Sequence, residues 1–409
     1  MTTTATQEPI ASPSVPDSAR IVWLPVAAVL LGTGWGANQF VPLLLIYRPA
    51  LGLSTGTLEA MFGFYAMGLI PGLLLAGPLS DACGRRCVVV PAAGLSLVAS
   101  LVLVAGAGSV ALLFCGRLLA GVSSGVVFGA GTAWLRELSA RAGASDHVSA
   151  RRAAVAMTAG FGLGPLVSGL LAQWAPSPRL VPYVPHIALM VVVLVLLRGA
   201  LETVDGPRRG VRLSVPGVRS VRFLRVVLPM APWVFATPAI AFALLPSLVH
   251  AGSATAGVAV VAVVTSLTAF AGVLIQPLAR RLDADAYRNR AAIVGLLVAA
   301  AALVLAAVTA QVDPIWMLVP CAVLFGSAYG LCLVAGLVEV GRLADKEALA
   351  GLTAAYYAVT YLGFAAPYLF SLAAHLADYP TLLTITAALA LATAAIVSRP
   401  GEEAAHDAA

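Results

Sequence analysis

Charged residues are scarce in this chain: they make up only 10% of its 409 residues, whereas hydrophobic residues make up 60%. A soluble domain usually carries roughly 25% charged residues, because its water-facing surface needs them. So few charges cannot cover a globule of this length, which excludes a soluble enzyme as the main interpretation. The mean hydropathy of +0.96 indicates a protein that lies in a lipid bilayer instead.

Cysteine, histidine and the common cofactor motifs are also scarce. The five cysteines and five histidines form neither a C-x-x-C pair nor a cluster, so we expect no disulfide framework, no metal site and no cofactor. No G-x-x-x-x-G-K-[ST] loop occurs, which argues against an ATP-driven pump. Residues 1–20 lack the basic segment that begins a signal peptide, and we expect them to form a disordered cytoplasmic tail.

Long apolar runs, in contrast, are abundant, and an apolar helix of about 20 residues spans a bilayer. The first half of the chain has such runs at residues 21–46, 56–80, 88–106, 109–134, 152–174 and 181–200. The second half has them at residues 225–248, 256–280, 290–311, 315–341, 347–374 and 380–398. The sequence therefore predicts an all-α integral membrane protein with twelve transmembrane helices. Its parts are bundles over 21–200 and 225–398, a cytoplasmic linker over 201–224 and a tail over 399–409.

Basic residues are distributed unevenly between the two sides of the predicted membrane. All but three of the 24 Lys and Arg residues fall on the side of the N-terminus, and only Arg48 and Arg179 fall on the other side. Because cytoplasmic loops carry the excess of positive charge, both termini are predicted to be cytoplasmic. The remaining basic residue, Arg117, lies inside a span. The strong preference for arginine over lysine favours a bacterial cell membrane.

The two halves share the spacing of several prolines and glycines. Pro25, Thr33 and Pro42 recur as Pro229, Thr237 and Pro246, and Gly121, Gly125 and Gly131 recur as Gly326, Gly330 and Gly336. These matches predict two six-helix pseudo-repeats. Parallel repeats of this kind place a substrate site at their interface, near the middle of the membrane.

The most specific motif lies between the second and third predicted spans and reads Gly77-Pro78-Leu79-Ser80-Asp81-Ala82-Cys83-Gly84-Arg85-Arg86. It resembles the G-x-L-x-D-x-x-G-R-[KR] signature of the major facilitator superfamily at every fixed position. The resemblance implies the twelve-helix fold of that family and a latch that closes the inner side. Asp81 and Arg85 are expected to pair, and Gly77 to permit close helix packing. The predicted inner gate consists of Gly77, Asp81, Gly84, Arg85, Arg86 and Glu137.

A second motif lies in the fifth predicted span, between residues 160 and 169. It resembles the G-x-x-x-G-P-x-x-G-G pattern of antiporter branches of the superfamily, except that serine replaces one glycine. Small residues let helices approach closely, and proline bends them. The resemblance implies export, and the motif residues are Gly160, Gly164, Pro165, Ser168 and Gly169.

Arg117 is the one basic residue deep inside a span, where a charge costs about 2.5–3.5 kcal/mol. With Gly121 it resembles the R-x-x-x-G signature of proton-linked drug exporters. Its depth predicts hydrogen bonds with the amides of Asn38 and Gln39, or with backbone carbonyls of a kinked helix. Acidic residues within spans are few, so the candidates for proton coupling are Arg117, Glu59 and Glu339; for the two acids an interfacial role is the alternative.

The predicted substrate cavity is aromatic and poor in charge, which suits an amphipathic compound or a lipophilic cation. Its candidate lining residues are Trp35, Asn38, Gln39, Tyr65, Arg117, Trp233, Thr237, Tyr329, Tyr356, Tyr357 and Tyr361.

The sequence thus favours a monomeric secondary transporter that exports small hydrophobic or amphipathic compounds, drugs or metabolites, in exchange for protons by alternating access. Its expected partners are the substrate, protons and membrane lipids, without nucleic acid. An uptake or facilitative carrier of a small organic solute is the alternative. A multi-pass membrane enzyme acting on a lipid is more remote, because the loops carry arginines without a cluster of histidines or acids.

Overall fold

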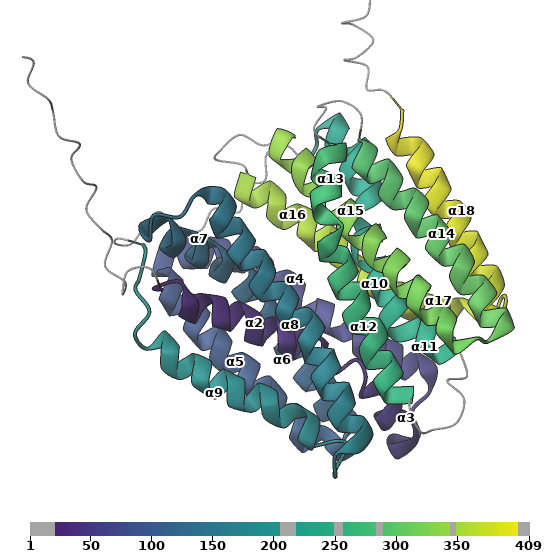
Figure 1. The fold of residues 1–409 in the computed structure, drawn as a ribbon, viewed down its shortest axis with the longest axis horizontal. Helices are drawn as coiled ribbons and strands as arrows, with labels where there is room; N and C mark the ends of the chain where they lie inside the picture. Colours follow the sequence, from purple (N-terminus) through teal and green to yellow (C-terminus); the bar gives the residue numbers. More distant parts are fainter. Residues whose placement is uncertain (1–20, 205–217, 249–256, 284–288, 344–348, 400–409) are drawn as a thin grey trace, which may run out of the picture.

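The computed structural model describes residues 21–204, 218–248, 257–283, 289–343 and 349–399, and these are helical almost throughout. The predicted tail 1–20, most of the linker and most of the C-terminal tail lie outside the described residues. Two bundles of helices lie side by side (Figure 1), the first half of the chain in purple to teal and the second in green to yellow.

The first bundle comprises α2 (Leu24–Asn38), α3 (Leu44–Leu51), α4 (Thr55–Cys83), α5 (Arg85–Ala105), α6 (Val110–Val126), α7 (Thr132–Arg141), α8 (Asp146–Trp174) and α9 (Val184–Leu197). The second comprises α10 (Leu228–Ala239), α11 (Leu245–Leu248), α12 (Gly257–Leu274), α13 (Gln276–Leu282), α14 (Arg290–Val312), α15 (Leu318–Leu343), α16 (Leu349–Tyr361), α17 (Ala366–Ala373) and α18 (Tyr379–Val397). Short π-helical and 3₁₀ turns join several of them, including Ile240–Leu244 and Leu362–Ala365.

Nine helical segments in the described ranges are long and apolar enough to cross a membrane. This is the architecture of a multi-pass membrane protein. The other three predicted ranges are helical but interrupted or short: 21–46 breaks between α2 and α3, 181–200 holds the 14-residue α9, and 347–374 divides into α16 and α17. Twelve crossings in two repeats therefore stay a prediction.

The break between α2 and α3 follows from the proline at its centre. Pro42 has no N–H to donate, so the four-residue hydrogen-bond pattern fails there. The N–H groups of Val41 and Leu43 donate instead to carbonyls three residues earlier, at 3.0 and 3.1 Å. This shift leaves the carbonyl oxygens of Ala37 and Gln39 without the helical donors that they would otherwise have.

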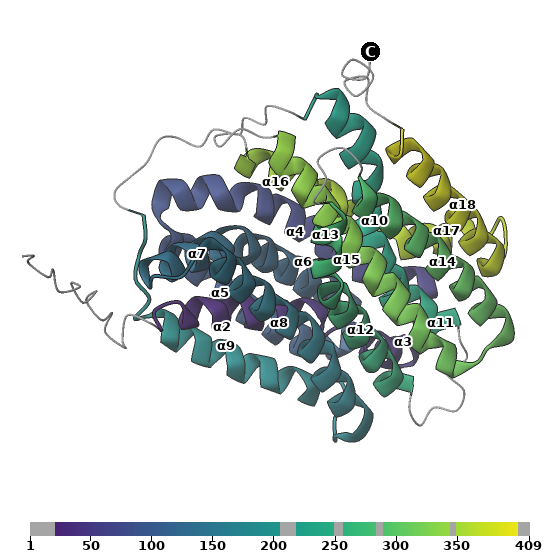
Figure 2. The ribbon, with the colours of Figure 1, turned by 45° about the horizontal axis from the view of Figure 1, so that its top comes forward.

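The two ends of the bundles differ in charge. We call one the basic end; it carries Arg85, Arg86, Arg141, Arg198, Arg280, Arg281 and Arg342. The other, the far end, carries Arg48 and Arg179. In Figures 1 and 2, α7 and α13 lie toward the basic end, and α3 and α11 lie toward the far end.

The two bundles contact each other where α8 packs on α12 and where α4 packs on α16 and α17. The hydroxyl of Ser266 donates to the carbonyl of Gly162 at 2.7 Å. Closer to the far end, the side-chain oxygen of Gln173 accepts the N–H groups of Val258 and Ala259 at 3.2 and 3.3 Å. These contacts join the halves from the middle of α8 to its far end.

Candidate functional site

A cavity with about 530 Å³ of empty space lies between the two bundles. Of the predicted lining residues, Asn38, Tyr65, Tyr329 and Tyr361 contribute to its wall. None of its lining residues carries a charge. The rest of the wall is formed by Ala37, Thr158, Phe161, Phe235, Pro238, Phe242, Ala269, Val273 and Phe364.

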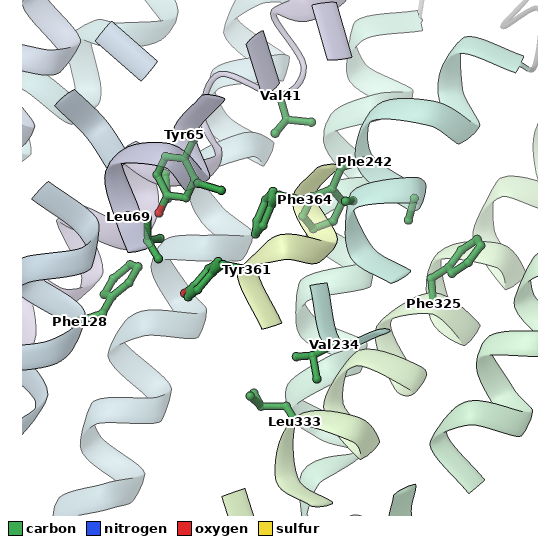
Figure 3. Packing of buried hydrophobic residues seen from close by; sticks show 14 of the residues in the cluster. Val41, Tyr65, Leu69, Phe128, Val234, Phe242, Phe325, Leu333, Tyr361 and Phe364 are labelled. Atoms are coloured by element: carbon green, nitrogen blue, oxygen red, sulfur yellow. The ribbon is translucent and has the colours of Figure 1, made fainter. Parts of the chain in front are cut away.

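Aromatic rings from both bundles meet at this cavity, and Phe364 lies among them. Its ring centroid is 5.2 Å from that of Phe62 and 5.9 Å from that of Tyr65, both on α4. Within the second half, the rings of Phe235 and Tyr361 stack with centroids 4.2 Å apart. Figure 3 shows Tyr65, Phe364 and Tyr361 gathered at the boundary between the halves. The cavity thus offers flat, uncharged faces to a ligand.

The other predicted lining residues, Trp35, Gln39, Arg117, Trp233, Thr237, Tyr356 and Tyr357, are not part of the cavity wall. The reason is that several of their polar atoms bond within their own bundle. Thr237 donates to the carbonyl of Trp233 at 3.1 Å, and the buried Tyr356 donates to the carbonyls of Cys332 and Leu333, each at 3.2 Å. These residues were predicted because their side chains are polar. The phenylalanines of the wall have no polar group and were missed.

Arg117 is 1% exposed and binds backbone carbonyls. One terminal nitrogen donates to the carbonyl of Ala37 at 3.0 Å, and the other to that of Phe62 at 3.1 Å. Its guanidinium also lies over the rings of Phe40 and Tyr65, 5.1 and 4.7 Å from their centroids. In the described part of the chain no carboxylate pairs with it. Arg117 therefore joins α4 to the carbonyl that the break in the first span leaves free.

Of the two alternatives predicted for Arg117, the backbone carbonyl of a kinked helix is confirmed at Ala37, and the amides of Asn38 and Gln39 are wrong. The Asn38 amide nitrogen points to the carbonyl of Phe161 at 3.5 Å, and that of Gln39 donates to the hydroxyl of Ser100 at 2.9 Å. Asn38 and Gln39 lie at about the same depth in the membrane as Arg117, as predicted. Their side chains, however, point away from its guanidinium group.

A buried hydrogen-bonded chain continues from Gln39 through Ser100 to His186. The hydroxyl of Ser100 lies 2.8 Å from Nδ1 of His186, and Nε2 of the same ring lies 3.0 Å from the carbonyl oxygen of Gly32. Because that carbonyl can only accept, Nε2 is the donor and Nδ1 accepts from Ser100. The chain ties α2, α5 and α9 together and uses a neutral imidazole.

Two glycines of the fifth-span motif lie directly against α2. A Cβ atom at Gly160 would come within 2.2 Å of the carbonyl oxygen of Leu31, and one at Gly164 within 2.6 Å of that of Trp35. Ser168 donates its hydroxyl to the carbonyl of Gln39 at 2.7 Å. The serine that replaces a motif glycine thus takes up the second carbonyl freed by the break in the first span.

The charged residues of the first motif form a cluster at the basic end. Arg85 pairs with Asp81 at 2.6 Å and with Glu137 at 2.9 Å, and the Asp81 side chain is 59% exposed. Gly84 separates α4 from α5 with φ at 99°, a conformation that favours glycine. Among the described residues a Cβ atom at Gly77 would meet nothing within 4 Å, so this part of the chain does not show the close packing predicted there. The Arg86 side chain donates to the carbonyl of Arg198 at 2.7 Å.

Glu202, which sequence reasoning missed, completes this cluster from the start of the linker. Its carboxylate accepts the N–H groups of Arg85 and Arg86 at 3.0 and 2.9 Å, and those of Thr203 and Val204 at 2.8 and 3.1 Å. Partial burial acts to raise the pKa of Glu202, but these four donors outweigh it and hold the pKa below its usual value. The acid therefore caps the N-terminus of α5, where negative charge is favoured.

We predict that Glu202→Gln detaches the linker from the first turn of α5. Because the pKa of Glu202 is lower in the folded protein than in the unfolded one, its contribution is complete above the unfolded value, about 4.3. That contribution is lost as the pH falls through the folded value. Hydrogen exchange at the amides of Arg85 and Arg86 should be faster in the variant at neutral pH. The matched control, Asp146→Asn in the first turn of α8, should leave both amides protected, and equal rates in the two variants would contradict the capping role.

Glu339 lies at the basic end in an ion-pair cluster of the second half. Its carboxylate pairs with Arg222 and lies 3.5 Å from the guanidinium of Arg342. A side-chain nitrogen of Arg342 donates in turn to the carbonyl of Asp283 at 2.6 Å. This cluster accounts for the burial of Glu339 and places it away from the aromatic cavity, whose lining does not include it.

Comparison with known proteins agrees with this architecture. An uncharacterised MFS-type transporter of Methanocaldococcus jannaschii is 24% identical over 153 residues, which are 37% of this chain and 38% of that protein. The chain thus matches well under half of the relative's length.

Three solved structures share the fold at low sequence identity. A peptide transporter POT in complex with sulfate has a TM-score of 0.78 at 14% identity, over 92% of this chain and 94% of that one. A POT family transporter in complex with 5-aminolevulinic acid has a TM-score of 0.74 at 12% identity, over 95% and 96%. The nucleoside transporter NupG has a TM-score of 0.72 at 12% identity, over 91% and 97%.

The sequence pattern of one family covers more than half of the chain. That family is described as the Major Facilitator Superfamily, and the match extends over residues 24–254. Together with the shared fold and the motif at the basic end, this match establishes that the chain belongs to the major facilitator superfamily.

Proposed function

We propose that this protein is a secondary transporter of the bacterial cell membrane that exports small hydrophobic or amphipathic compounds in exchange for protons. Alternating access would arise from movement of the two six-helix halves against each other. The observation that carries the proposal is the uncharged aromatic cavity between the halves. The cavity lies where parallel repeats place a substrate site, at the interface of the two halves.

The chemistry of the wall favours planar hydrophobic substrates. Phe235, Tyr361 and Phe364 present ring faces, which attract aromatic compounds and organic cations. A peptide or an amino acid carries charged groups that need partners when they leave water, and the wall supplies no charged side chain. For this reason we do not extend to this chain the ligands of the peptide transporters that share its fold.

The charge distribution supports an orientation with the basic end in the cytoplasm. The contacts between α8 and α12 described above would then close the outer side in this conformation. In the opposite state, Asp81 and Arg85 would form the latch on the inner side. The exposure of Asp81 leaves its carboxylate available for that contact. The expected contact region is the start of the eleventh span, whose first two residues, 347 and 348, lie outside the described residues.

A facilitative or uptake carrier is the second candidate. The observation that favours it is the lining of the aromatic cavity, which includes no carboxylate to exchange protons directly with a substrate. A comparison of transport with and without a pH gradient separates the two functions.

We predict that purified protein in liposomes moves ethidium, an aromatic cation, faster across a pH gradient than without one. Tyr361→Ala should reduce this flux by about tenfold, because it removes a stacking face worth on the order of 1 kcal/mol together with its buried area. The control is Tyr368→Ala, whose ring is 38% exposed on the neighbouring α17 and which should keep the flux of the unmodified protein. Equal flux with and without the gradient would indicate a facilitative carrier, and no flux above that of empty liposomes would reject this substrate class.

A further inference from the structure

Glu59 is a buried carboxyl group near the far end of α4. It is only 2% exposed. Among the described residues neither of its carboxyl oxygens makes a hydrogen bond of good geometry, although the hydroxyl of Ser371 on α17 lies beside it. An ionised carboxylate taken out of water without a partner carries a large free-energy cost. In this conformation the group therefore needs a proton or a bound cation.

Glu59 lines a second cavity, which is formed by both halves and shares Phe242 with the aromatic cavity. It has about 430 Å³ of empty space and lies between α3 and α4 of the first half and α11 and α12 of the second. Figure 1 shows α3, α11 and α12 close to one another at the far end. Apolar residues form most of its wall, and its polar lining residues are Arg48, Thr55, Glu59 and Ser247.

The groups that face Glu59 favour a proton over a metal cation. Among the described residues, Arg48 on α3 is the charged group close to it, and Ser371 on α17 and Tyr379 on α18 are the other polar neighbours. The lining residues from the turn Ile240–Leu244, α11 and α12 carry no charge. A metal cation requires several oxygen ligands in close geometry, whereas this wall is mainly apolar and includes a guanidinium.

We propose that Glu59 is a proton-binding site in the gate at the far end, and that its protonation permits the two halves to close there. When α4 separates from α17 and α11, water reaches the carboxyl group and the proton leaves its oxygen for a water molecule. When the gate closes, the carboxyl oxygen takes up a proton from water on the same side, and the neutral group is buried. No net proton transfer across the membrane is involved. The inference rests on the alternating access of the proposed function and not on its substrate or on proton exchange.

The test measures the far-end gate directly in the full-length protein. Spin labels are attached at Trp174→Cys and Leu376→Cys, which are 68% and 88% exposed on opposite halves, after replacement of the five native cysteines. Distances are measured in lipid nanodiscs at pH 8 and pH 5.5. We expect a longer distance at pH 8 and a short one at pH 5.5. Glu59→Gln, which keeps the neutral form, should show the short distance at both pH values.

Two further variants serve as controls. Glu59→Asp retains a titratable carboxyl group and should keep the response to pH. Asp378→Asn replaces another far-end carboxylate, which caps α18 through the N–H of Thr381 at 3.0 Å, and should also keep it because asparagine caps equally well. Insensitivity of the unmodified protein to pH, persistence of the shift in Glu59→Gln, or a shift that follows Na⁺ at constant pH would each overturn the proposal.

A second pair of labels, at Arg136→Cys and Arg281→Cys of the basic end, separates this proposal from the proposed function. Movement at the basic end without a pH response at the far end would reject the role of Glu59 and leave alternating access intact. If neither pair moves under any condition, both proposals fail. A failure of ethidium transport together with a pH response that depends on Glu59 would reject the substrate class alone.

Discussion

Replacement of Arg117 by alanine should abolish transport and strongly destabilise the first bundle. The change removes the donors to the buried carbonyls of Ala37 and Phe62, and each unpaired buried group costs about 1–3 kcal/mol. It also empties the space between the rings of Phe40 and Tyr65, where a large-to-small change costs on the order of 2–5 kcal/mol. Because Ala37 and Tyr65 line the aromatic cavity, the loss should alter its shape as well.

The measurement combines thermal unfolding in detergent with initial rates of ethidium flux. Arg117→Lys should be intermediate in both, because a single ammonium lacks the planar fork that reaches two carbonyls. The matched control is Arg179→Ala, in which an arginine that binds the carbonyl of Ala107 at 3.0 Å at the far end is removed; its effect on flux should be small. An Arg117→Leu variant that folds and transports normally would leave Arg117 without the role assigned to it.

Gly121→Val should prevent stable packing of α4 on α6. A Cβ atom at this position would lie 2.0 Å from the carbonyl oxygen of Tyr65 and 3.0 Å from the backbone nitrogen of Leu69. Both are helical backbone atoms that cannot turn away as a side chain can. The helices must separate, and overpacking of this kind costs about 3 kcal/mol or more.

The appropriate control is Gly94→Val on α5, where an added Cβ atom would meet nothing within 4 Å. Both changes place the same β-branched residue in a helix, so their difference reports packing alone. We expect a large loss of monodisperse protein on size-exclusion chromatography for Gly121→Val and a minor loss for Gly94→Val. Similar losses in both variants would show that backbone propensity, and not helix contact, governs the effect.

The course of the helices follows from the sequence because apolar runs of bilayer length have few alternatives in a membrane. The motif cluster of Asp81, Arg85 and Glu137 was also predictable, because family resemblance assigned its members. For Arg117 the sequence predicted the kind of partner, the backbone carbonyls of a kinked helix, as one of two alternatives. It did not predict which carbonyls, because the packing of the bundle sets where the side chain points. Glu202 was missed for a related reason. In the sequence an acid in a linker looks like any solvent-exposed charge, and only the structure shows which helix it caps.

The aromatic cavity shows where polarity misleads. Tyr65, Tyr329 and Tyr361 were predicted correctly because tyrosine is both aromatic and polar. Phe235 and Phe364, which contribute as much ring surface, resemble lipid-facing residues in every sequence property. The packing of α4 and α10 against the turn Leu362–Ala365 distinguishes them.

The break in the first span has a mechanical consequence. A proline kink whose carbonyls remain unpaired bends easily, but here Arg117 holds the carbonyl of Ala37 and Ser168 holds that of Gln39. The kink is therefore stiff, and the first bundle should rotate as one rigid body. Movement is therefore expected at the interface between the bundles, where the side chains of Gln173 and Ser266 make hydrogen bonds with backbone groups that can be exchanged for others. A cross-link within the first bundle, between α2 and α8, should consequently leave the transport cycle intact, whereas one across α8 and α12 should stop it.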